Sequence, residues 1–211
     1  MKGKSLEGVR LYCFSPGDFL MGRDPIEIVA AQIRGGADVI QLREKNMPKG
    51  KALELGLAIR DMARQEGVLF IVNDDLDLAL ILDADGVHLG QDDIPIEYAR
   101  PFLKDKLIGI STHSLSQARE AIESGADYIG VGPVFKTETK TSVDPVVGID
   151  LVLQAKTLSA TPVIAIGGIR EANIGSLINS GINRVAIISD ILSSNDIEAK
   201  TRALKEKLKR A

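Results

Sequence analysis

The sequence predicts an α/β protein that folds as a single (β/α)8 barrel (TIM barrel) domain over residues 1–211. Two observations predict this fold. Short apolar segments alternate with helical patterns from end to end, and an internal repeat precedes every second strand. Strands that alternate with helices of about ten residues are typical of parallel sheets built from βαβ units. Eight such units fit a closed barrel.

The expected elements follow one another in strict alternation. The expected strands are Val9–Phe14, Asp38–Leu42, Val68–Val72, Gly86–Leu89, Lys106–Ser111, Asp127–Val131, Pro162–Ile166 and Arg184–Ile188. The expected helices are Pro25–Arg34, Lys49–Gln65, Leu76–Leu82, Ile96–Phe102, Leu115–Glu123, Gly148–Lys156, Glu171–Ile178 and Asp196–Lys209. Asp24 before Pro25 predicts an N-cap followed by proline at the first helical position. Ser114 with Gln117 fits a capping box, and Leu204 and Leu208 predict an amphipathic terminal helix.

The internal repeat links a helix to an even-numbered strand four times. Its copies are Gly36–Ile40, Ala84–Val87, Gly125–Ile129 and Gly181–Val185. Four copies of a unit of two strands and two helices would give the eight strands and eight helices of a closed barrel. A doubly wound open sheet is the competing architecture, but a G-x-G-x-x-G segment does not follow the first strand.

The composition is that of one ordinary globular domain: 211 residues, 45% hydrophobic, 26% charged and a net charge of −3. The mildly acidic balance argues against a nucleic-acid-binding protein. No apolar stretch approaches the length of a membrane span, and the N-terminus lacks the apolar core of a signal peptide, so we expect a cytoplasmic protein without membrane partners. The lone Cys13 is expected to be a small buried side chain rather than a nucleophile.

In a (β/α)8 barrel, sites form at the carboxyl ends of the strands. The second strand ends in Gln41-Leu42-Arg43-Glu44-Lys45. Alternation along a strand places Gln41, Arg43 and Lys45 on one face, where they can hold an anion and read a ring edge. The alternative is an exposed strand end with surface salt bridges.

Acidic residues follow the third and fourth strands, as Asn73-Asp74-Asp75 and Asp92-Asp93. Neighbouring strands lie about 4.8 Å apart, so carboxylates just past their ends can share one hard cation. Mg²⁺ is the natural candidate, because it binds one or two carboxylates and completes its shell with water and phosphate oxygens. We expect Asp74 and Asp93 to be metal ligands, and at least one of Asp75 and Asp92 to be a helix N-cap.

The later strand ends carry small and hydroxyl residues. Ser111 can serve as a ligand hydroxyl, whereas His113 is expected in a solvated turn and His88 as a packed, hydrogen-bonded core residue. Gly167 and Gly168 permit close backbone approach, and with Ile188 and Ser189 on the adjacent strand they predict a phosphate site. The loop from Thr137 to Lys140 offers hydroxyl and ammonium groups between the two anion sites.

These segments together resemble the thiamine-phosphate synthase family, in order and over nearly the whole chain. The matching segments are QLREK at 41–45, ND at 73–74, GVHLGQDD at 86–93, GISTHS at 109–114, GVGPVFKTETK at 130–140, AIGGI at 165–169 and IS at 188–189. Asp92 stands directly before the second metal aspartate, where the family often has Glu, which leaves open whether Asp92 or Asp93 reaches the metal.

The resemblance implies an enzyme of thiamine biosynthesis. Such a transferase joins 4-amino-2-methyl-5-hydroxymethylpyrimidine diphosphate to a thiazole phosphate, carboxylated or not, and releases diphosphate with the help of Mg²⁺. The resemblance assigns the binding of the pyrimidine diphosphate to Gln41, Leu42, Arg43, Glu44, Lys45, Asn73 and Ser111. It assigns the metal to Asp74 and Asp93. It assigns the thiazole phosphate to Thr137, Glu138, Thr139, Gly168, Ile188 and Ser189. Lys140 is placed beside the leaving diphosphate. Arg43, Lys45, Ser111 and Lys140 are the expected catalytic residues.

Three other functions remain as alternatives. The tautomerase branch of the same fold usually carries His where Pro133 stands and lacks the two metal aspartates. A catalytically silent phosphate-binding barrel would not need Asp74, Asp93 and Arg43 together. A phosphosugar isomerase or aldolase would need a Schiff-base lysine or a glutamate base that strands six and eight do not offer. A homo-oligomer is compatible with the sequence, and we expect the loop at 136–141 to close over substrates.

Overall fold

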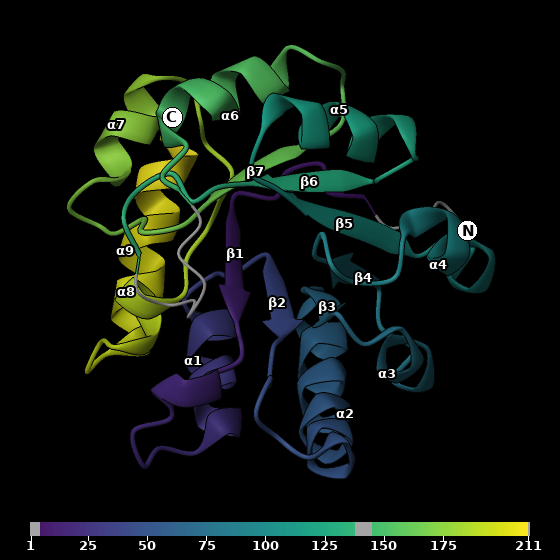
Figure 1. Ribbon diagram of the computed structural model, residues 1–211. Helices are drawn as coiled ribbons and strands as arrows, with labels where there is room; N and C mark the ends of the chain where they lie inside the picture. The colour runs from purple at the N-terminus through teal and green to yellow at the C-terminus, as the bar shows by residue number, and fades with distance from the viewer. Residues whose placement is uncertain (1–4, 138–144, 211) are drawn as a thin grey trace.

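A computed structural model, which describes residues 5–137 and 145–210, shows a closed barrel of parallel strands inside a layer of helices (Figure 1). The strands pair in chain order and β8 closes on β1. Their bounds are β1 Leu11–Phe14, β2 Val39–Leu42, β3 Leu69–Asn73, β4 Gly86–Leu89, β5 Leu107–Thr112, β6 Tyr128–Val131, β7 Val163–Ile166 and β8 Val185–Ala186. The helices are η1 Gly17–Phe19, α1 Pro25–Arg34, α2 Lys49–Glu66, α3 Leu76–Ile81, α4 Ile96–Leu103, α5 Leu115–Glu123, α6 Gly148–Lys156, α7 Ile174–Asn179, α8 Ser189–Leu192 and α9 Ile197–Lys209. The predicted barrel is confirmed.

Every predicted strand and helix is present, and the largest differences in their bounds lie near β7 and β8. The bounds of β4, α1, α5 and α6 are those expected from the sequence. β8 is shorter because the backbone of Ile188 leaves the extended region, at φ −107° and ψ −82°, and α8 starts at Ser189. α7 begins later than expected, at Ile174, and in the turn before it the backbone N–H of Glu171 is bound to the Asp190 carboxylate, 2.9 Å away. η1 and α8 are too short to produce a periodic pattern, and the sequence did not predict them.

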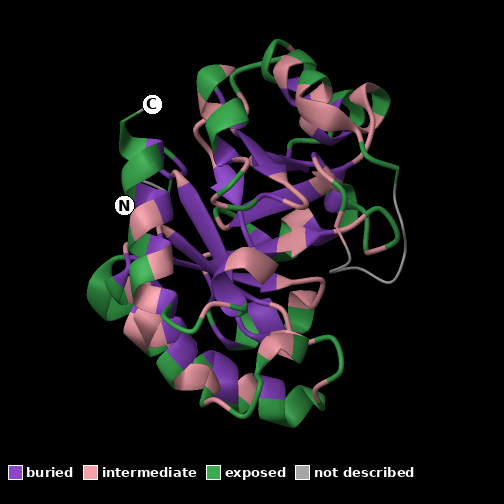
Figure 2. Ribbon diagram, turned by 90° about the vertical axis from the view of Figure 1, so that its left-hand side faces the viewer, coloured by how far each residue is buried: buried purple, intermediate pink, exposed green. Residues whose placement is uncertain are grey.

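Two hydrophobic layers follow from the alternation of side chains along the strands. One layer fills the space between the strands and the helices, and it contains Cys13, Leu204 and Leu208, all fully buried. The other fills the barrel itself and includes Tyr12, Phe14, Ile71, Tyr128 and Ile164. Figure 2 shows this organisation as buried strands inside helices whose outer faces are exposed. The structural role predicted for Cys13 is confirmed, and burial raises the pKa of its thiol.

The capping predictions are confirmed for two helices, and of the two aspartates expected near helix starts only Asp75 occupies an N-cap position. Asp24 accepts a hydrogen bond from the N–H of Ile26, and Ser114 accepts one from Gln117, whose own side chain accepts from the N–H of His113. Asp75 occupies the N-cap position of α3, but its side chain does not cap the helix and instead pairs with Lys49 at 2.8 Å. α4 has Pro95 at its N-cap, so Asp92 does not cap it.

The internal repeat forms the floor of the barrel, at the amino ends of the strands. The aspartate directly before each of the first three even-numbered strands binds backbone N–H groups at the start of the preceding strand. Asp38 binds Arg10 and Leu11 at 2.8 and 2.9 Å, Asp85 binds Phe70 at 2.9 Å, and Asp127 binds Ile108 at 2.7 Å. Each of these aspartates is a clamp between two consecutive strands. The fourth copy of the repeat has Asn183 in this place.

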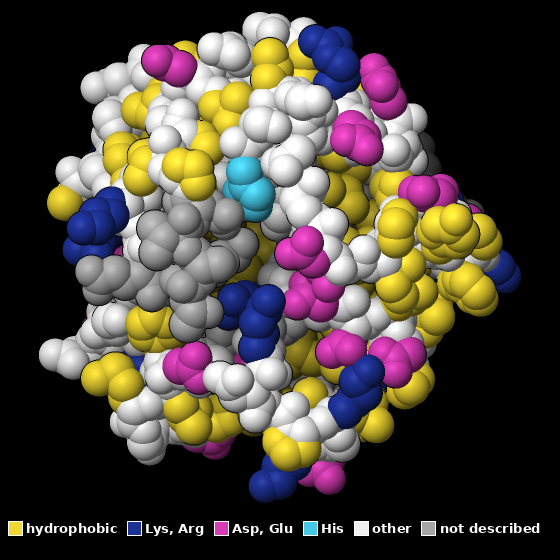
Figure 3. Space-filling model, viewed as in Figure 1, with side chains coloured by type: hydrophobic (Ala, Val, Ile, Leu, Met, Phe, Trp, Pro, Cys, Tyr) yellow, Lys and Arg dark blue, Asp and Glu magenta, His cyan; other side chains and the backbone are white. Residues whose placement is uncertain are grey.

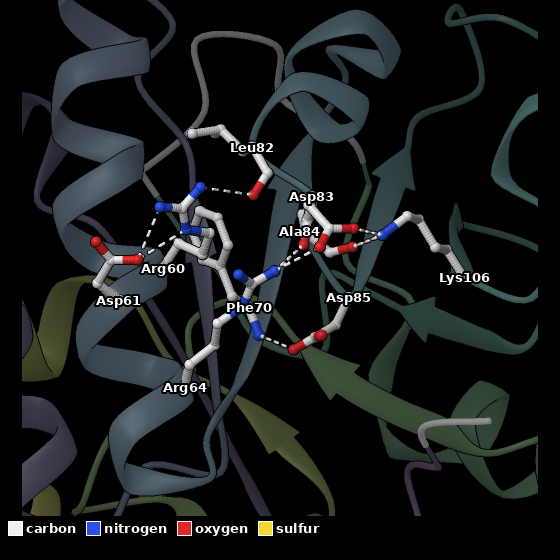
Figure 4. A network of polar contacts seen from close by, with 9 residues as sticks. All are labelled: Arg60, Asp61, Arg64, Phe70, Leu82, Asp83, Ala84, Asp85 and Lys106. Carbon is white, nitrogen blue, oxygen red and sulfur yellow. Dashed lines mark hydrogen bonds and ion pairs between the residues drawn. The ribbon is translucent and has the colours of Figure 1, made fainter. Parts of the chain in front are cut away.

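Figure 4 shows the floor around Asp85 and the charged groups that attach α2 to it. The carboxylate of Asp83 binds Arg64 of α2 at 2.7 Å and Lys106 before β5 at 2.6 Å. Arg60, one turn earlier on α2, pairs with Asp61 at 2.8 Å. These ion pairs are partly exposed, so each contributes little alone, and they lie at the end of the barrel opposite the candidate site.

The Asp38 clamp is expected to contribute strongly to stability. Asp38 also pairs with Lys205 of α9, whose side chain is only 8% exposed. Replacing Asp38 with Ala would leave a buried ammonium unpaired and two N–H groups unbound, so we expect the free energy of unfolding to fall by about 3 kcal/mol. Urea unfolding checks this. Asp61→Ala, at a pair that is 58% exposed on the aspartate side, is the control and should change stability by less than about 0.5 kcal/mol.

In the described part of the chain, the helices are too short or too polar for any of them to cross a membrane.

Candidate active site

A cavity of about 340 Å³ opens at the carboxyl ends of the strands. Basic, acidic and histidine side chains surround a hollow on this face of the molecule (Figure 3). Among the residues that line the cavity are Tyr12, Gln41, Arg43, Asn73, His88, Ser111, Tyr128, Thr137, Gly168, Ile188 and Ser189. A second hollow of about 260 Å³ lies beside it, and Asn73 lines both. The strand ends predicted from the sequence therefore do meet at one place.

The side chains at the end of β2 line two different hollows. Gln41 and Arg43 line the main cavity, as the alternation predicted. Lys45 does not, because β2 ends at Leu42 and the chain turns at Lys45, so that the alternation does not extend past Arg43. The prediction of one common face is therefore wrong for Lys45, which lines the second hollow with its ammonium 3.3 Å from Asp74.

The two residues between these positions serve the fold. The side chain of Leu42 is buried between the sheet and the helices. The carboxylate of Glu44 accepts a hydrogen bond from the N–H of Gly17, at 3.1 Å, and so ties the end of β2 to η1. Both residues nevertheless line the second hollow, which leaves them near the ligand that the resemblance implied.

Arg43 is a half-buried cation at the mouth of the cavity. Its backbone N–H is held by the hydroxyl of Ser15 at 2.8 Å. Burial lowers the pKa of the guanidinium, and the carboxylates of Asp74, Asp18 and Glu44 oppose that effect. An anionic ligand in the cavity would favour the charged guanidinium in the same way as these carboxylates.

Asp74 and Asp93 come together as predicted, at the edge of the second hollow. Asp74 has a left-handed backbone, with φ +61°, and its N–H binds the carbonyl of His88 at 2.9 Å. This turn brings its carboxyl group within hydrogen-bonding reach of Asp93. Burial raises the pKa of Asp74, Asp93 raises it further, and Lys45 acts in the opposite direction. Asp93 is itself oriented by the N–H of Gly90, 2.6 Å from its Oδ2, whereas Asp92 is exposed.

Two facing carboxylates offer oxygen donors that suit a hard divalent cation, and the ammonium of Lys45 offsets part of their charge. The described residues contain no cluster of three or more His, Cys, Asp or Glu side chains that could hold a metal alone. A cation between Asp74 and Asp93 would therefore complete its shell with water or ligand oxygens, which is how Mg²⁺ is usually bound. The chemistry of these residues fits the predicted metal.

Ser111 lies inside the cavity in contact with a group that the sequence did not place there. Its hydroxyl is 2.9 Å from Nε2 of His88, and Nδ1 of His88 is 3.1 Å from the hydroxyl of Tyr128. His88 is hydrogen-bonded, as expected, but it lines the cavity rather than the core outside the barrel. The solvated turn expected for His113 is wrong, because its Nδ1 is 2.6 Å from the carbonyl of Gly132 and the residue lines the cavity.

Tyr12 and Tyr128 are cavity residues that the sequence reasoning missed. Both are buried in the barrel, and their hydroxyls are 3.1 Å apart. The available signal was the alternation within β1 and β6, which turns these two positions inward. An apolar segment that contains a tyrosine is typical of a hydrophobic core, and its pattern does not indicate that the tyrosine hydroxyl faces a cavity.

The glycines after β7 bring two backbone segments together. A β-carbon on Gly167 would lie 2.5 Å from Pro133, and one on Gly168 would lie 2.5 Å from the carbonyl oxygen of Lys136. Both glycines have positive φ, at +98° and +63°. The sequence predicted that these glycines let a phosphate approach the backbone. In the structure, the segment after β6 that leads into Thr137 lies close against them.

The far wall of the cavity is formed by Thr137, Gly168, Ile188 and Ser189. Ser189 is the first residue of α8, and the N–H groups of a first helical turn have no partner within the helix. Glu138, Thr139 and Lys140 lie outside the described residues, and so does most of the loop that we expected to close over substrates.

Comparisons with known proteins agree on one family. Residues 11–191 match the family model described as thiamine monophosphate synthase. The chain is 48% identical to the thiamine-phosphate synthase of Pelotomaculum thermopropionicum, over 92% of this chain and 90% of the relative. It is 41% identical to that of Chloroflexus aurantiacus, over 93% and 91%. A solved thiamine phosphate pyrophosphorylase from Pyrococcus furiosus superposes with a TM-score of 0.88 at 35% identity, with 96% of each chain covered.

Proposed function

The chain belongs to the thiamine-phosphate synthase family, and from this premise we propose how its cavity binds two substrates and promotes their joining. The protein is an enzyme of thiamine biosynthesis, a transferase that makes thiamine phosphate and releases diphosphate. The observation that carries the proposal is the division of the cavity. One end has Arg43 next to the carboxylate pair, and the other end offers backbone N–H groups and glycines.

The pyrimidine diphosphate is assigned to the first end. Gln41 and Ser111 lie on the cavity wall where they can reach the pyrimidine edge, and Asn73 lies between the main cavity and the second hollow. Arg43 and Lys45 supply positive charge on either side of Asn73, which suits the two phosphates. The backbones of Leu42 and Glu44 complete this wall.

The thiazole phosphate is assigned to the second end. Gly168, Ile188 and Ser189 present backbone N–H groups of a tight turn and of a helix start, which favour an anion. Thr137 adds a hydroxyl at the same wall. Glu138 and Thr139, which follow it in sequence, are proposed to contribute to the same phosphate site, and Lys140 is proposed to lie beside the diphosphate.

Asp74 and Asp93 are proposed to hold Mg²⁺ next to the diphosphate, with Asp93 rather than Asp92 as the second ligand. When bound, the metal would neutralise charge that develops on the leaving diphosphate. Its removal from the assay tests this assignment. Turnover of pyrimidine diphosphate with thiazole phosphate should stop in excess chelator and return on addition of Mg²⁺.

The chemical step is proposed to be a dissociative substitution. Breaking the bond between the pyrimidine methylene and the diphosphate oxygen leaves negative charge on the diphosphate and positive charge on the methylene. Arg43, Lys45 and Lys140 stabilise the leaving group, and the walls hold the thiazole nitrogen in line with the methylene. A protein nucleophile is not needed, because the thiazole nitrogen supplies the electron pair for the new bond.

Substituents on the pyrimidine test the dissociative step. An electron-withdrawing group in place of the 2-methyl group would destabilise the positive charge on the methylene, so the chemical step should slow sharply. Single-turnover kinetics measure it without interference from product release. An unchanged rate constant for the chemical step would contradict the dissociative route and leave the substrate assignments standing.

The proposed site needs one copy of the chain and one domain, residues 1–211. Exposed apolar side chains gather over α4 (Figure 3), at Ile94, Tyr98 and Phe102. They are the surface at which we would look for a homo-oligomer, by sedimentation velocity of the wild type.

A further inference from the structure

Five side chains of the cavity form one continuous chain of hydrogen bonds. Nε2 of Gln41 is 2.7 Å from the hydroxyl of Tyr12, which is 3.1 Å from the hydroxyl of Tyr128. That hydroxyl is 3.1 Å from Nδ1 of His88, and Nε2 of His88 is 2.9 Å from the hydroxyl of Ser111. The chain crosses the barrel from β2 through β1, β6 and β4 to β5. Its two ends are the residues assigned to the pyrimidine edge.

The strands are built to accommodate this chain. A β-carbon on Gly109 of β5 would lie 2.0 Å from the ring of Tyr128, and one on Gly130 of β6 would lie 3.4 Å from the ring of His88. The rings of Tyr12 and Tyr128 are 6.2 Å apart and tilted, and those of His88 and Tyr128 are 5.4 Å apart. The chain therefore occupies a space that two glycines keep open.

The number of available protons requires all the hydrogen bonds in this series of side chains to run in the same direction. Tyr12, Tyr128 and a neutral His88 each carry one proton that can take part, so each accepts from one neighbour and donates to the other. Burial raises the pKa of both tyrosines, so both keep their protons. A reversal at one link would place two donors or two acceptors face to face, which is costly in a buried site.

The direction follows from Gln41. Its nitrogen, which only donates, faces Tyr12. In the order that starts from this donor, Tyr12 would donate to Tyr128, Tyr128 would donate to Nδ1 of His88, and Nε2–H of His88 would donate to Ser111. This order leaves the amide oxygen of Gln41 as an acceptor and the hydroxyl proton of Ser111 as a donor. Among the described residues, no hydrogen bond reaches that amide oxygen.

We propose that Tyr12, Tyr128 and His88 are positioning residues, which couple Gln41 to Ser111 so that the cavity selects a ring with a donor and an acceptor in one order. A 4-aminopyrimidine has that order, because its amino group donates to Gln41 and its ring nitrogen accepts from Ser111. The 4-oxo analogue presents the reverse order, an oxygen that accepts and a ring N–H that donates. The inference rests on the proposed placement of the pyrimidine, and it adds the reason for its selection.

The first test measures the direction of the hydrogen bonds themselves and does not need an active enzyme. The protein has two histidines, so ¹⁵N NMR of the wild type and of His113→Gln identifies the signals of His88. The inference expects the Nε2–H tautomer in the wild type and a mixture of tautomers in Tyr128→Phe. The Nδ1–H tautomer or a mixture in the wild type would overturn it.

The second test reads selectivity. We expect Tyr128→Phe to reduce the preference for the 4-amino over the 4-oxo pyrimidine diphosphate by about tenfold, roughly the effect of one neutral hydrogen bond. The change should appear in the KM for the pyrimidine diphosphate, and the KM for the thiazole phosphate should stay the same. Tyr98→Phe, at an exposed tyrosine of α4, is the matched control.

The two tests separate this inference from the proposed function. An unchanged preference in a folded Tyr128→Phe variant would overturn the coupling, while turnover of the 4-amino substrate would still support the function. If the wild type shows the Nε2–H tautomer but fails to discriminate between the two pyrimidines, the pyrimidine lies elsewhere and the proposed placement is wrong.

Discussion

Replacing Asp74 is expected to reduce kcat/KM by about 100-fold or more, because the metal it would hold supplies several kcal/mol of charge stabilisation. Asp74→Ala removes the carboxylate but also puts alanine at φ +61°, which strains the backbone. Asp74→Asn is therefore the sharper variant, since asparagine tolerates the left-handed region. Steady-state turnover over a range of Mg²⁺ concentrations measures the effect, and the activity that remains in Asp74→Asn should require much more metal.

The matched comparison is Asp93→Asn against Asp92→Asn, two neighbouring aspartates of which only Asp93 lies within reach of Asp74. Asp93→Asn should resemble Asp74→Asn, and Asp92→Asn should behave as the wild type. The reverse result would make Asp92 the metal ligand. Full activity of a folded Asp74→Asn protein at low Mg²⁺ would remove this aspartate from the metal site altogether.

Gly168→Ala is expected to raise the KM for the thiazole phosphate by at least about tenfold. The new β-carbon would lie 2.5 Å from the carbonyl oxygen of Lys136 and 2.7 Å from that of Phe135, so the two backbone segments must separate. Losing one hydrogen bond to a charged phosphate costs about 1.5–3 kcal/mol. Kinetics with each substrate varied in turn should show the KM for the pyrimidine diphosphate almost unchanged.

Gly175→Ala is the control for this substitution, because a β-carbon there meets nothing within 4 Å and α7 favours alanine over glycine. Its kinetics should equal those of the wild type, and its stability should be the same or slightly higher. If Gly168→Ala folds and binds the thiazole phosphate normally, the phosphate does not lie against this turn.

The repeat and the alternation of apolar strands predicted the barrel because both are properties of short sequence segments. The same reasoning failed where a strand stops. Lys45 was placed beside Arg43 by an alternation that does not extend past Arg43, and β8 was drawn through Ile188, where the chain turns into α8. The end of a strand depends on how its neighbours pair, and that information is not local.

The candidate site could be predicted where a side chain follows a strand end, as with Asp74, Asp93 and Gly168. It could not be predicted where a contact crosses the barrel. Tyr12 and Tyr128 are 116 residues apart on strands that do not pair, and only the closed ring brings their hydroxyls together. The tilt and closure of the barrel set such contacts, and a single sequence does not contain them in readable form.

The three aspartate clamps of the floor also bear on how the chain could be rearranged. Asp38, Asp85 and Asp127 each bind the start of the strand that precedes them in the chain, across at most 28 residues. A circular permutant that is joined at the termini and reopened between β4 and α4 would thus keep every one of these clamps. The ring depends on which units are neighbours in space, and it does not depend on which unit is synthesised first.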